Sequence, residues 1–259
     1  MNIYIYIIVI ILCYLIYNNL FYKKFSFKDK ISVIILNYKR PHNLMYSIPI
    51  FLKYKIINEI IVANGDKHNK FHYSHPKIKI INQYELNNKY GAARRFINIK
   101  YVKNEITLFL DDDILVSEYG INKLYHKLIS TKKNTIYGPI GRGCNENHGY
   151  LNIKLSNISS FFNNIFTYNN VLLTGFALVK TNIVRKFMTH KDGFTKYKNW
   201  FIKHRGNCED LALNKFIKSY YNEKPVFIKG NYIFLDKNNG YSSNKSHLTV
   251  RNEFCKKYK

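Results

Sequence analysis

Short apolar runs separated by amphipathic stretches and polar breaks dominate the chain after residue 30. Segments His42–Tyr54 and Tyr90–Lys100 have the spacing of helices, and a bend is expected at Pro49. Strands that alternate with helices indicate an α/β fold with a mainly parallel central sheet flanked by helices. Four strands are predicted, at Ile31–Leu36, Glu59–Ala63, Lys77–Ile81 and Ile106–Leu110.

The second half of the chain has a less regular pattern. Asn170–Lys180 has the composition of a strand, and Cys208–Tyr221 has the spacing of a helix. The tail from Asn238 is polar and is expected to form a loop. No internal repeat is visible, so residues 31–259 are expected to form one α/β domain.

The N-terminus carries an unbroken apolar and aromatic run from Ile3 to Tyr17, which reaches a bilayer-spanning length if it is extended to Tyr22. No small-residue cleavage site follows. Residues 1–22 are therefore predicted to be an uncleaved transmembrane signal-anchor, and residues 23–30 a short basic stem. A buried first strand or helix is the alternative. Two lysines directly after the run favour a cytosolic position for the rest of the chain, whereas a Golgi-type anchor requires the opposite topology.

The composition indicates a folded protein with a strong excess of positive charge. An apolar fraction of 46% excludes wholesale disorder, and 41 Lys and Arg against 16 Asp and Glu give a net charge of +25. That excess favours an anionic partner such as a nucleic acid, a membrane surface, an acidic polymer or a phosphorylated small molecule. The codon bias of an AT-rich genome explains it equally well. The four cysteines show no CxxC zinc pattern and allow one disulfide.

Acidic residues are scarce, and five of the sixteen lie in two clusters. Asp111, Asp112 and Asp113 directly follow a buried strand, where three carboxylates repel one another unless a cation lies among them. Hard oxygen ligands suit Mg²⁺ or Mn²⁺, and such a metal can bind a diphosphate and stabilise a leaving group. Glu209 and Asp210 open a predicted helix. Solvated turns and helix N-termini also favour acids, so each cluster has a structural alternative.

Polar segments follow three of the predicted strands, at the carboxyl ends where ligands of parallel sheets bind. Arginine guanidinium groups match phosphate oxygens, although any single arginine is more often a solvated surface residue. The chain has no Gly-x-Gly-x-x-Gly and no Walker motif, which argues against Rossmann dinucleotide binding and P-loop chemistry. The candidate phosphate or base contacts are Arg40, Arg94, Arg95 and Arg251.

Several segments together resemble a known family. They include Ile31–Leu44 (ISVIILNYKRPHNL), the Asp triplet followed by Ile-Leu-Val-Ser, and Gly206–Asn214 (GNCEDLALN). The chain resembles the exostosin-like glycosyltransferases, the family represented by the C-terminal catalytic domain of exostosins (glycosyltransferase family 64). The resemblance implies that residues 31–259 are a catalytic domain. In the tail, the segment similar to the family's closing motif consists of Gly240-Tyr-Ser242, His247, Arg251 and Cys255.

The resemblance implies a glycosyltransferase A-type fold that uses a UDP-sugar and Mn²⁺ and retains the anomeric configuration. Asp113 would bind the metal, and Arg251 would hold the diphosphate. Asn207 and Asp210 would face the anomeric centre. The other positions would bind substrates. The uridine and ribose would be bound by Arg40, Asn64, Asn88 and either Arg94 or Arg95, and the ribose and donor sugar by Asp111 and Asp112. The acceptor would lie near Thr174 and Gly175, and Glu209 would bind a substrate group next to Asp210.

Two cysteines, Cys208 and Cys255, match the family's disulfide pair, which would tie the tail to the helix that carries the second acid cluster. A disulfide implies an oxidising compartment. The resemblance therefore favours a single-pass membrane protein with a lumenal catalytic domain of the Golgi or ER type, and a cytosolic catalytic domain is the alternative.

These features predict a metal-dependent retaining glycosyltransferase that moves an N-acetylhexosamine or related hexose from a UDP-sugar to a glycan or glycoprotein acceptor. Asp210 is the candidate nucleophile or stabiliser of the oxocarbenium ion. In an inverting transferase, the alternative within the class, the Glu-Asp pair would supply a general base. A nucleic-acid-binding protein would explain the charge of +25 but not the Asp triplet, so no nucleic-acid partner is expected. An inactive membrane-anchored lectin or scaffold is a third alternative.

Overall fold

The described helices and strands of this computed structural model lie within residues 31–259, which form one compact unit. The predicted signal-anchor at residues 1–22 and almost all of the predicted stem lie outside the described residues. In the described part of the chain, no helix is both long enough and apolar enough to span a bilayer. The described residues are 30–147, 149–151, 170–236 and 246–258.

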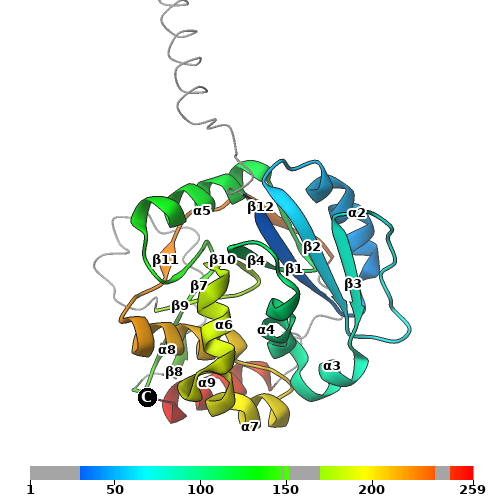
Figure 1. Cartoon of the computed structure of the whole chain (residues 1–259). Helices are drawn as coiled ribbons and strands as arrows, with labels where there is room; N and C mark the ends of the chain where they lie inside the picture. Colours follow the sequence, from blue (N-terminus) through cyan, green and yellow to red (C-terminus); the bar gives the residue numbers. More distant parts are fainter. Residues whose placement is uncertain (1–29, 148, 152–169, 237–245, 259) are drawn as a thin grey trace, which may run out of the picture. The chain divides into compact units, whose positions relative to one another are not determined.

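A seven-stranded sheet forms the centre of the fold (Figure 1). Its strands are β1 (Ile31–Asn37), β2 (Ile57–Asn64), β3 (Ile78–Asn82), β4 (Ile106–Asp111), β6 (Ile136–Gly138), β10 (Phe176–Lys180) and β11 (Val226–Phe227). The order across the sheet is β11-β6-β10-β4-β1-β2-β3. Strands β4, β1, β2 and β3 run parallel to one another, and β10 is antiparallel to both of its neighbours. The prediction of a mainly parallel central sheet in an α/β fold is confirmed, and the four predicted strands are all present.

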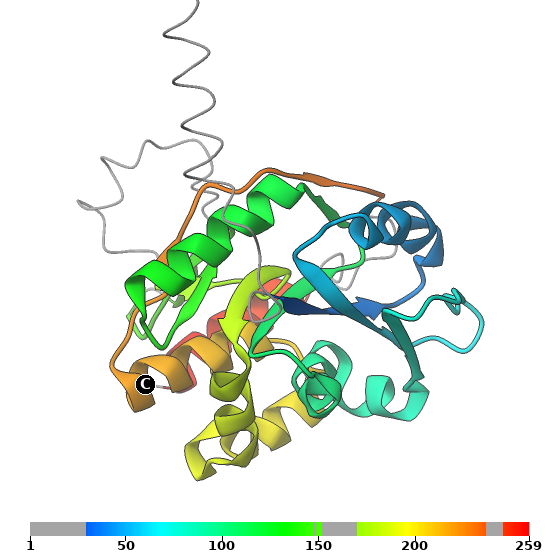
Figure 2. The same cartoon turned by 45° about the horizontal axis from the view of Figure 1, so that its top comes forward.

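Helices cover both faces of the sheet. Those in the described residues are α2 (Pro41–Leu52), α3 (Tyr84–Tyr90), α4 (Arg94–Ile97), α5 (Glu118–Thr131), α6 (Thr181–Thr189), α7 (Lys196–Lys203), α8 (Glu209–Tyr221) and α9 (His247–Lys257). Figure 2 shows α2 and α5 on one side of the sheet and α4 and α6 on the other. Because both faces are covered, the strands carry continuous apolar runs rather than an alternating pattern. Helix α2 continues through Pro49 to Leu52.

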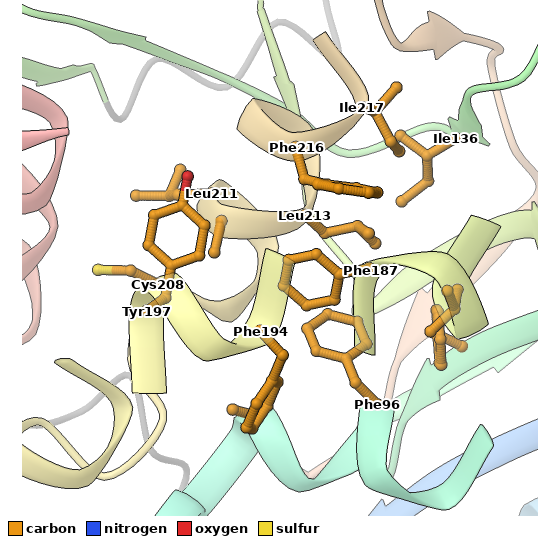
Figure 3. Close-up of a cluster of buried hydrophobic side chains, with 14 of the residues drawn as sticks. Phe96, Ile136, Phe187, Phe194, Tyr197, Cys208, Leu211, Leu213, Phe216 and Ile217 are labelled. Carbon is orange, nitrogen blue, oxygen red and sulfur yellow. The ribbon is translucent and has the colours of Figure 1, made fainter. Parts of the chain in front are cut away.

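Aromatic rings fill the core on the side of α4 and α6 (Figure 3). Phe96 of α4 packs edge-on against Phe109 of β4 and Phe187 of α6, with ring centroids 5.6 and 5.2 Å apart. Phe187 also contacts Phe216 of α8, at a centroid distance of 5.4 Å. Such edge-to-face pairs fix the orientation of the rings as well as burying apolar area. The cluster therefore anchors α8, which begins with the second acid cluster, to the central sheet.

The helix expected at Tyr90–Lys100 is built from short pieces instead. Helix α3 ends where that helix was expected to begin, and α4 lies between two 3₁₀ turns, Gly91–Ala93 and Asn98–Tyr101. Gly91 has a φ of 42°, and a Cβ at this position would lie 1.7 Å from the backbone oxygen of Arg205. Only glycine permits this close approach of a second loop. The interruption leaves both arginines of α4 buried.

Two predictions for the second half are wrong in part. The strand expected at Asn170–Lys180 is divided into β9 (Val171–Leu172) and β10. Between them the Gly175 carbonyl accepts a hydrogen bond of 2.9 Å from the Asp111 amide, so this turn is fixed to the end of β4. The tail is not a loop throughout, because α9 follows and buries side chains that recur at helical spacing, including Arg251 and Cys255.

The described residues also form two small sheets. Strand β5 (Ile114–Val116) pairs with β12 (Tyr232–Phe234). Strand β7 (Gly141–Asn145) pairs with both β8 (Gly149–Leu151) and β9, all antiparallel. The β7–β8 hairpin packs against α9. It thus joins the middle of the chain to its C-terminal helix.

Candidate functional site

The candidate site lies beyond the carboxyl ends of β1 and β4. In the sheet, β2 and β3 lie on one side of β1, and β4 lies on the other. The segments that follow β1 and β4 therefore leave the sheet in opposite directions, and a crevice forms between them. A cavity of about 460 Å³ occupies this position. The predicted residues that line it are Arg40, Arg94, Arg95, Asp111, Asp112, Asp113, Thr174, Gly175, Asn207, Glu209, Asp210 and Arg251.

The Asp triplet forms one wall of the cavity and is paired with Arg40. Asp112 is buried, and its carboxylate accepts a hydrogen bond of 3.0 Å from the backbone N–H of Tyr38. The Arg40 guanidinium forks between the carboxylates of Asp112 and Asp113, with a distance of 2.9 Å to Asp113 Oδ2. Burial raises the pKa of Asp112 to about 7 although Arg40 opposes the shift. Arg40 therefore offsets only part of the cost of burying the Asp112 carboxylate.

Arg95 joins the two acid clusters. Its guanidinium donates to Asp111 Oδ1 at 2.7 Å and to the Thr174 carbonyl at 2.8 Å, and its Nε lies 3.4 Å from Glu209 Oε1. Burial lowers the pKa of Arg95, but the charges of Asp111 and Glu209 outweigh it and the pKa is raised. Thr174 Oγ1 also donates to Glu209 Oε1, at 2.9 Å. A Cβ on Gly175 would lie 2.5 Å from Asp111 Oδ2, so a side chain there would displace this network.

Asp210 of α8 and Arg251 of α9 form a buried ion pair that also lines the cavity. Arg251 Nη2 donates to Asp210 Oδ2 at 2.7 Å, and both side chains are about 5% exposed. Burial lowers the pKa of Arg251, but the negative charge of Asp210 and other contacts outweigh this effect. The pKa of Arg251 is therefore raised above its ordinary value. Asn207, just before α8, donates to the backbone carbonyl of His247 at 3.3 Å. The pair can present a cation and a carboxylate together to a ligand in the cavity.

Two of the predicted uridine contacts do not line the cavity. Asn64 is fully buried, and its amide is bonded to Asn37 at 2.8 Å and to the Phe71 carbonyl at 3.1 Å. Asn88 is exposed on α3, whereas the neighbouring Asn87 lines the cavity. The side-chain Oδ1 of Asn87 accepts a hydrogen bond from Arg94, and burial lowers the pKa of Arg94 to about 9.

Several lining residues were not selected from the sequence as site residues. His247 lies one helical turn before Arg251, in a tail segment already noted for its resemblance, so its spacing could have identified it. Tyr150 comes from β8, in a region whose sequence has no distinctive motif. Arg142 and Arg205 also line the cavity. Strand β7, which carries Arg142, and the turn that carries Arg205 reach the site only through the tertiary fold.

The residues present fit a divalent cation that is shared with a ligand. In the described part of the chain, no three His, Cys, Asp or Glu side chains are arranged as a complete metal site. Asp113 nevertheless lines the cavity with a side chain that is 17% exposed. Burial and the adjacent charge of Asp111 raise the pKa of Asp113, so a cation beside it would be stabilising. Carboxylate oxygens are the ligands that Mg²⁺ and Mn²⁺ prefer.

The disulfide differs from the predicted pair. Cys255 is bonded to Cys144 of β7, with a Cα–Cα distance of 5.4 Å, and Cys208 is a buried free thiol. The predicted Cys208–Cys255 bond is therefore wrong. The β7–β8 hairpin packs across α9 and brings Cys144 to Cys255, whereas the Cys208 sulfur lies 3.8 Å from the Val250 carbonyl, more than one turn away. Figure 3 shows Cys208 within the apolar cluster beside Tyr197.

No curated protein matches the chain at a significant level. A family model, the glycosyl transferase family 64 domain, matches residues 31–259. The matched range contains every residue that lines the cavity, including both acid clusters and Arg251. Since the match extends over nearly the whole chain, the protein belongs to glycosyltransferase family 64 and is a glycosyltransferase.

Proposed function

We propose that the protein is a membrane-anchored, Mn²⁺-dependent retaining glycosyltransferase. It would transfer an N-acetylhexosamine or related hexose from a UDP-sugar to a glycan or glycoprotein acceptor. The observation that carries the proposal is the convergence of both acid clusters on one cavity of about 460 Å³, where Arg95 contacts Asp111 and Glu209. The strand order β3-β2-β1-β4-β10-β6-β11 supports the glycosyltransferase A-type fold.

The cavity has room and polar groups for a nucleotide-sugar. Ligand pockets commonly enclose about 300–1,000 Å³, and this cavity lies in that range. Arg40, Arg94 and Asn87 lie near the ends of β1 and α3 and would bind the nucleoside. Asp111 and Asp112 supply acceptor oxygens for ribose and sugar hydroxyls. The cavity walls exclude water from part of the donor, which strengthens the electrostatic interactions inside.

Asp113 is the residue that would hold the Mn²⁺, together with the donor diphosphate. When bound, the metal would neutralise charge on the departing UDP. Arg40 donates to Asp113 and orients its carboxylate. Arg251 is positively charged and lines the same cavity, so it would also bind the diphosphate.

Asp210 is the proposed group beneath the anomeric carbon. Its Oδ2 is held by Arg251 at 2.7 Å, and a second hydrogen bond of 2.8 Å reaches Oδ1 from the Leu211 amide. A carboxylate held in place in this way can act as a nucleophile or stabilise an oxocarbenium ion. Double displacement through a covalent bond from Asp210 to the anomeric carbon, with UDP leaving first, would retain the anomeric configuration. Attack of the acceptor on the stabilised oxocarbenium ion from the face that UDP leaves would retain it as well. Asn207 would bind the sugar next to it, and Thr174, Gly175 and Glu209 would meet the acceptor.

The Cys144–Cys255 disulfide supports a lumenal catalytic domain, because such bonds persist in oxidising compartments. We infer a single-pass protein of the Golgi or ER type, anchored by residues 1–22. Protease protection of the chain in sealed microsomes would test this topology. A catalytic domain that is digested without detergent would contradict it.

The function is tested by UDP release from a panel of UDP-sugars, with Mn²⁺ or with EDTA. Turnover of one donor that requires Mn²⁺ is expected. Asp113→Asn should abolish metal-dependent UDP binding, whereas Asp192→Asn, a half-exposed carboxylate outside the cavity, should leave it unchanged. Equal UDP affinity in both variants would contradict the metal role of Asp113. The anomeric configuration of the product distinguishes retention from inversion.

A further inference from the structure

The β7–β8 hairpin is attached to α9 at two neighbouring positions. Cys144 and Tyr150 are opposite each other in the register of β7 and β8. Cys144 is bonded to Cys255, and the backbone N–H of Tyr150 donates to the Asn252 side chain at 3.1 Å. Cys255 and Arg251 are four residues apart and therefore lie on one face of α9. The same face of the helix thus carries the covalent bond and the arginine that enters the cavity.

The ring of Tyr150 lies against the Arg251 guanidinium, with 4.4 Å between the ring centroid and Cζ. Planar guanidinium groups stack favourably on aromatic faces. On its other side Arg251 donates to Asp210 at 2.7 Å, and among the described residues its Nε has no hydrogen-bond partner. A single ion pair fixes the position of one guanidinium nitrogen but does not fix the plane of the group. The ring of Tyr150 supplies the second surface that fixes the plane of the guanidinium.

The close approach of the hairpin to α9 depends on Gly149. This residue has a φ of 73°, and a Cβ there would lie 1.6 Å from Asn252 Oδ1. Glycine adopts this left-handed conformation without strain and leaves room for the Asn252 side chain. The hairpin can therefore hold Tyr150 between α9 and the cavity. Burial raises the pKa of the Tyr150 phenol although Arg251 lowers it, which agrees with a ring largely removed from water.

We propose that Tyr150 is a positioning residue that holds the Arg251 guanidinium toward both Asp210 and the donor diphosphate. The proposal rests on the proposed function, because the orientation of Arg251 affects turnover only if Arg251 meets the diphosphate. The aromatic ring performs this role. The ring, rather than the hydrogen bond of the Tyr150 hydroxyl group to Arg251, supplies most of this effect.

The first test compares Tyr150→Leu with Tyr150→Phe in the full-length chain. Tyr150→Leu removes the ring and is expected to lower kcat/KM for the UDP-sugar about 10-fold and to weaken UDP binding by a similar factor. Tyr150→Phe keeps the ring and is expected to stay within about threefold of the unaltered chain. Tyr119→Leu, on an exposed side chain of α5, is the control for loss of a tyrosine. A Leu variant that raises only the KM of the acceptor would overturn the proposal and make Tyr150 an acceptor contact.

The second test measures the contact without turnover. Urea unfolding of Tyr150→Leu, Arg251→Met and the double variant is expected to be non-additive, because either change alone removes the same stacking contact. Additive effects would overturn the positioning role even if the enzyme is active. An active unaltered chain with a fully active Tyr150→Leu variant would overturn this inference alone. An unaltered chain without turnover or UDP binding would overturn the proposed function as well.

Discussion

Removing the disulfide by Cys144→Ala is expected to reduce the free energy of unfolding substantially. The bond joins residues separated by 111 positions, so it closes a long loop and lowers the conformational entropy of the unfolded chain. For a loop of this length the chain-entropy relation gives about 5 kcal/mol at 25 °C, and measured effects of single disulfides are typically about 2–4 kcal/mol. Cys144 is also buried, so truncation of its side chain adds a smaller packing loss. We therefore expect Cys144→Ala to destabilise the protein by about 3–5 kcal/mol.

Urea unfolding of the non-reduced protein measures this loss, and Cys208→Ala is the matched control. Cys208 is buried without a disulfide, so its replacement should cost about 1 kcal/mol and leave the bond intact. A reducing agent should lower the stability of the unaltered chain and of Cys208→Ala, but not that of Cys144→Ala. Peptide mapping should find Cys144 joined to Cys255. If Cys208→Ala instead abolishes the bond and Cys144→Ala does not, the pairing inferred here is refuted.

Two further predictions concern the network between the acid clusters. Burial raises the pKa of Glu209 from 4.5 to about 7, so its contribution to stability is fully present below 4.5 and is lost as the pH rises through about 7. Glu209→Gln cannot ionise, so its free energy of unfolding, measured in urea titrations, should increase relative to that of the unaltered chain between pH 5 and pH 8. An equal difference in the free energy of unfolding at the two pH values would contradict this. Arg95→Met should destabilise the fold by about 3 kcal/mol or more because it leaves Asp111 and Glu209 without their shared cation. A loss below about 1 kcal/mol in the same assay would show that solvent compensates these carboxylates.

The sequence predicted the sheet well because the signals of its strands are local. Continuous apolar runs mark strands buried on both faces, and the first four were all correct within two residues at each end. The alternation of strands and helices then placed Asp111–Asp113 at the carboxyl edge of a parallel sheet. Because that edge is where ligands bind, the location of the site followed from the same pattern.

The partners of the site residues depended on contacts between distant segments. Arg40, read as a phosphate contact, forks onto Asp112 and Asp113 from more than 70 positions away. Arg95 bonds to Asp111 and to the distant Thr174 carbonyl. The residue types indicated a site that binds charged groups. They did not show which arginine pairs with which carboxylate, because charge pairing depends on the distance between side chains in the fold.

The sequence by itself determined the fold class, the position of the site at the strand ends and the residue types that line it. Each of these depends on short-range patterns, namely the period of apolar residues and the polar groups that follow a strand. The tertiary structure alone decided that Cys144 pairs with Cys255, that Asn87 rather than Asn88 faces the cavity, and that Tyr150 lies on Arg251. The disulfide and the contact of Tyr150 with Arg251 join segments about a hundred positions apart, and the choice of Asn87 over Asn88 depends on how α3 is rotated about its axis. They are set by the packing of the hairpin and helices on the sheet, which no local pattern specifies.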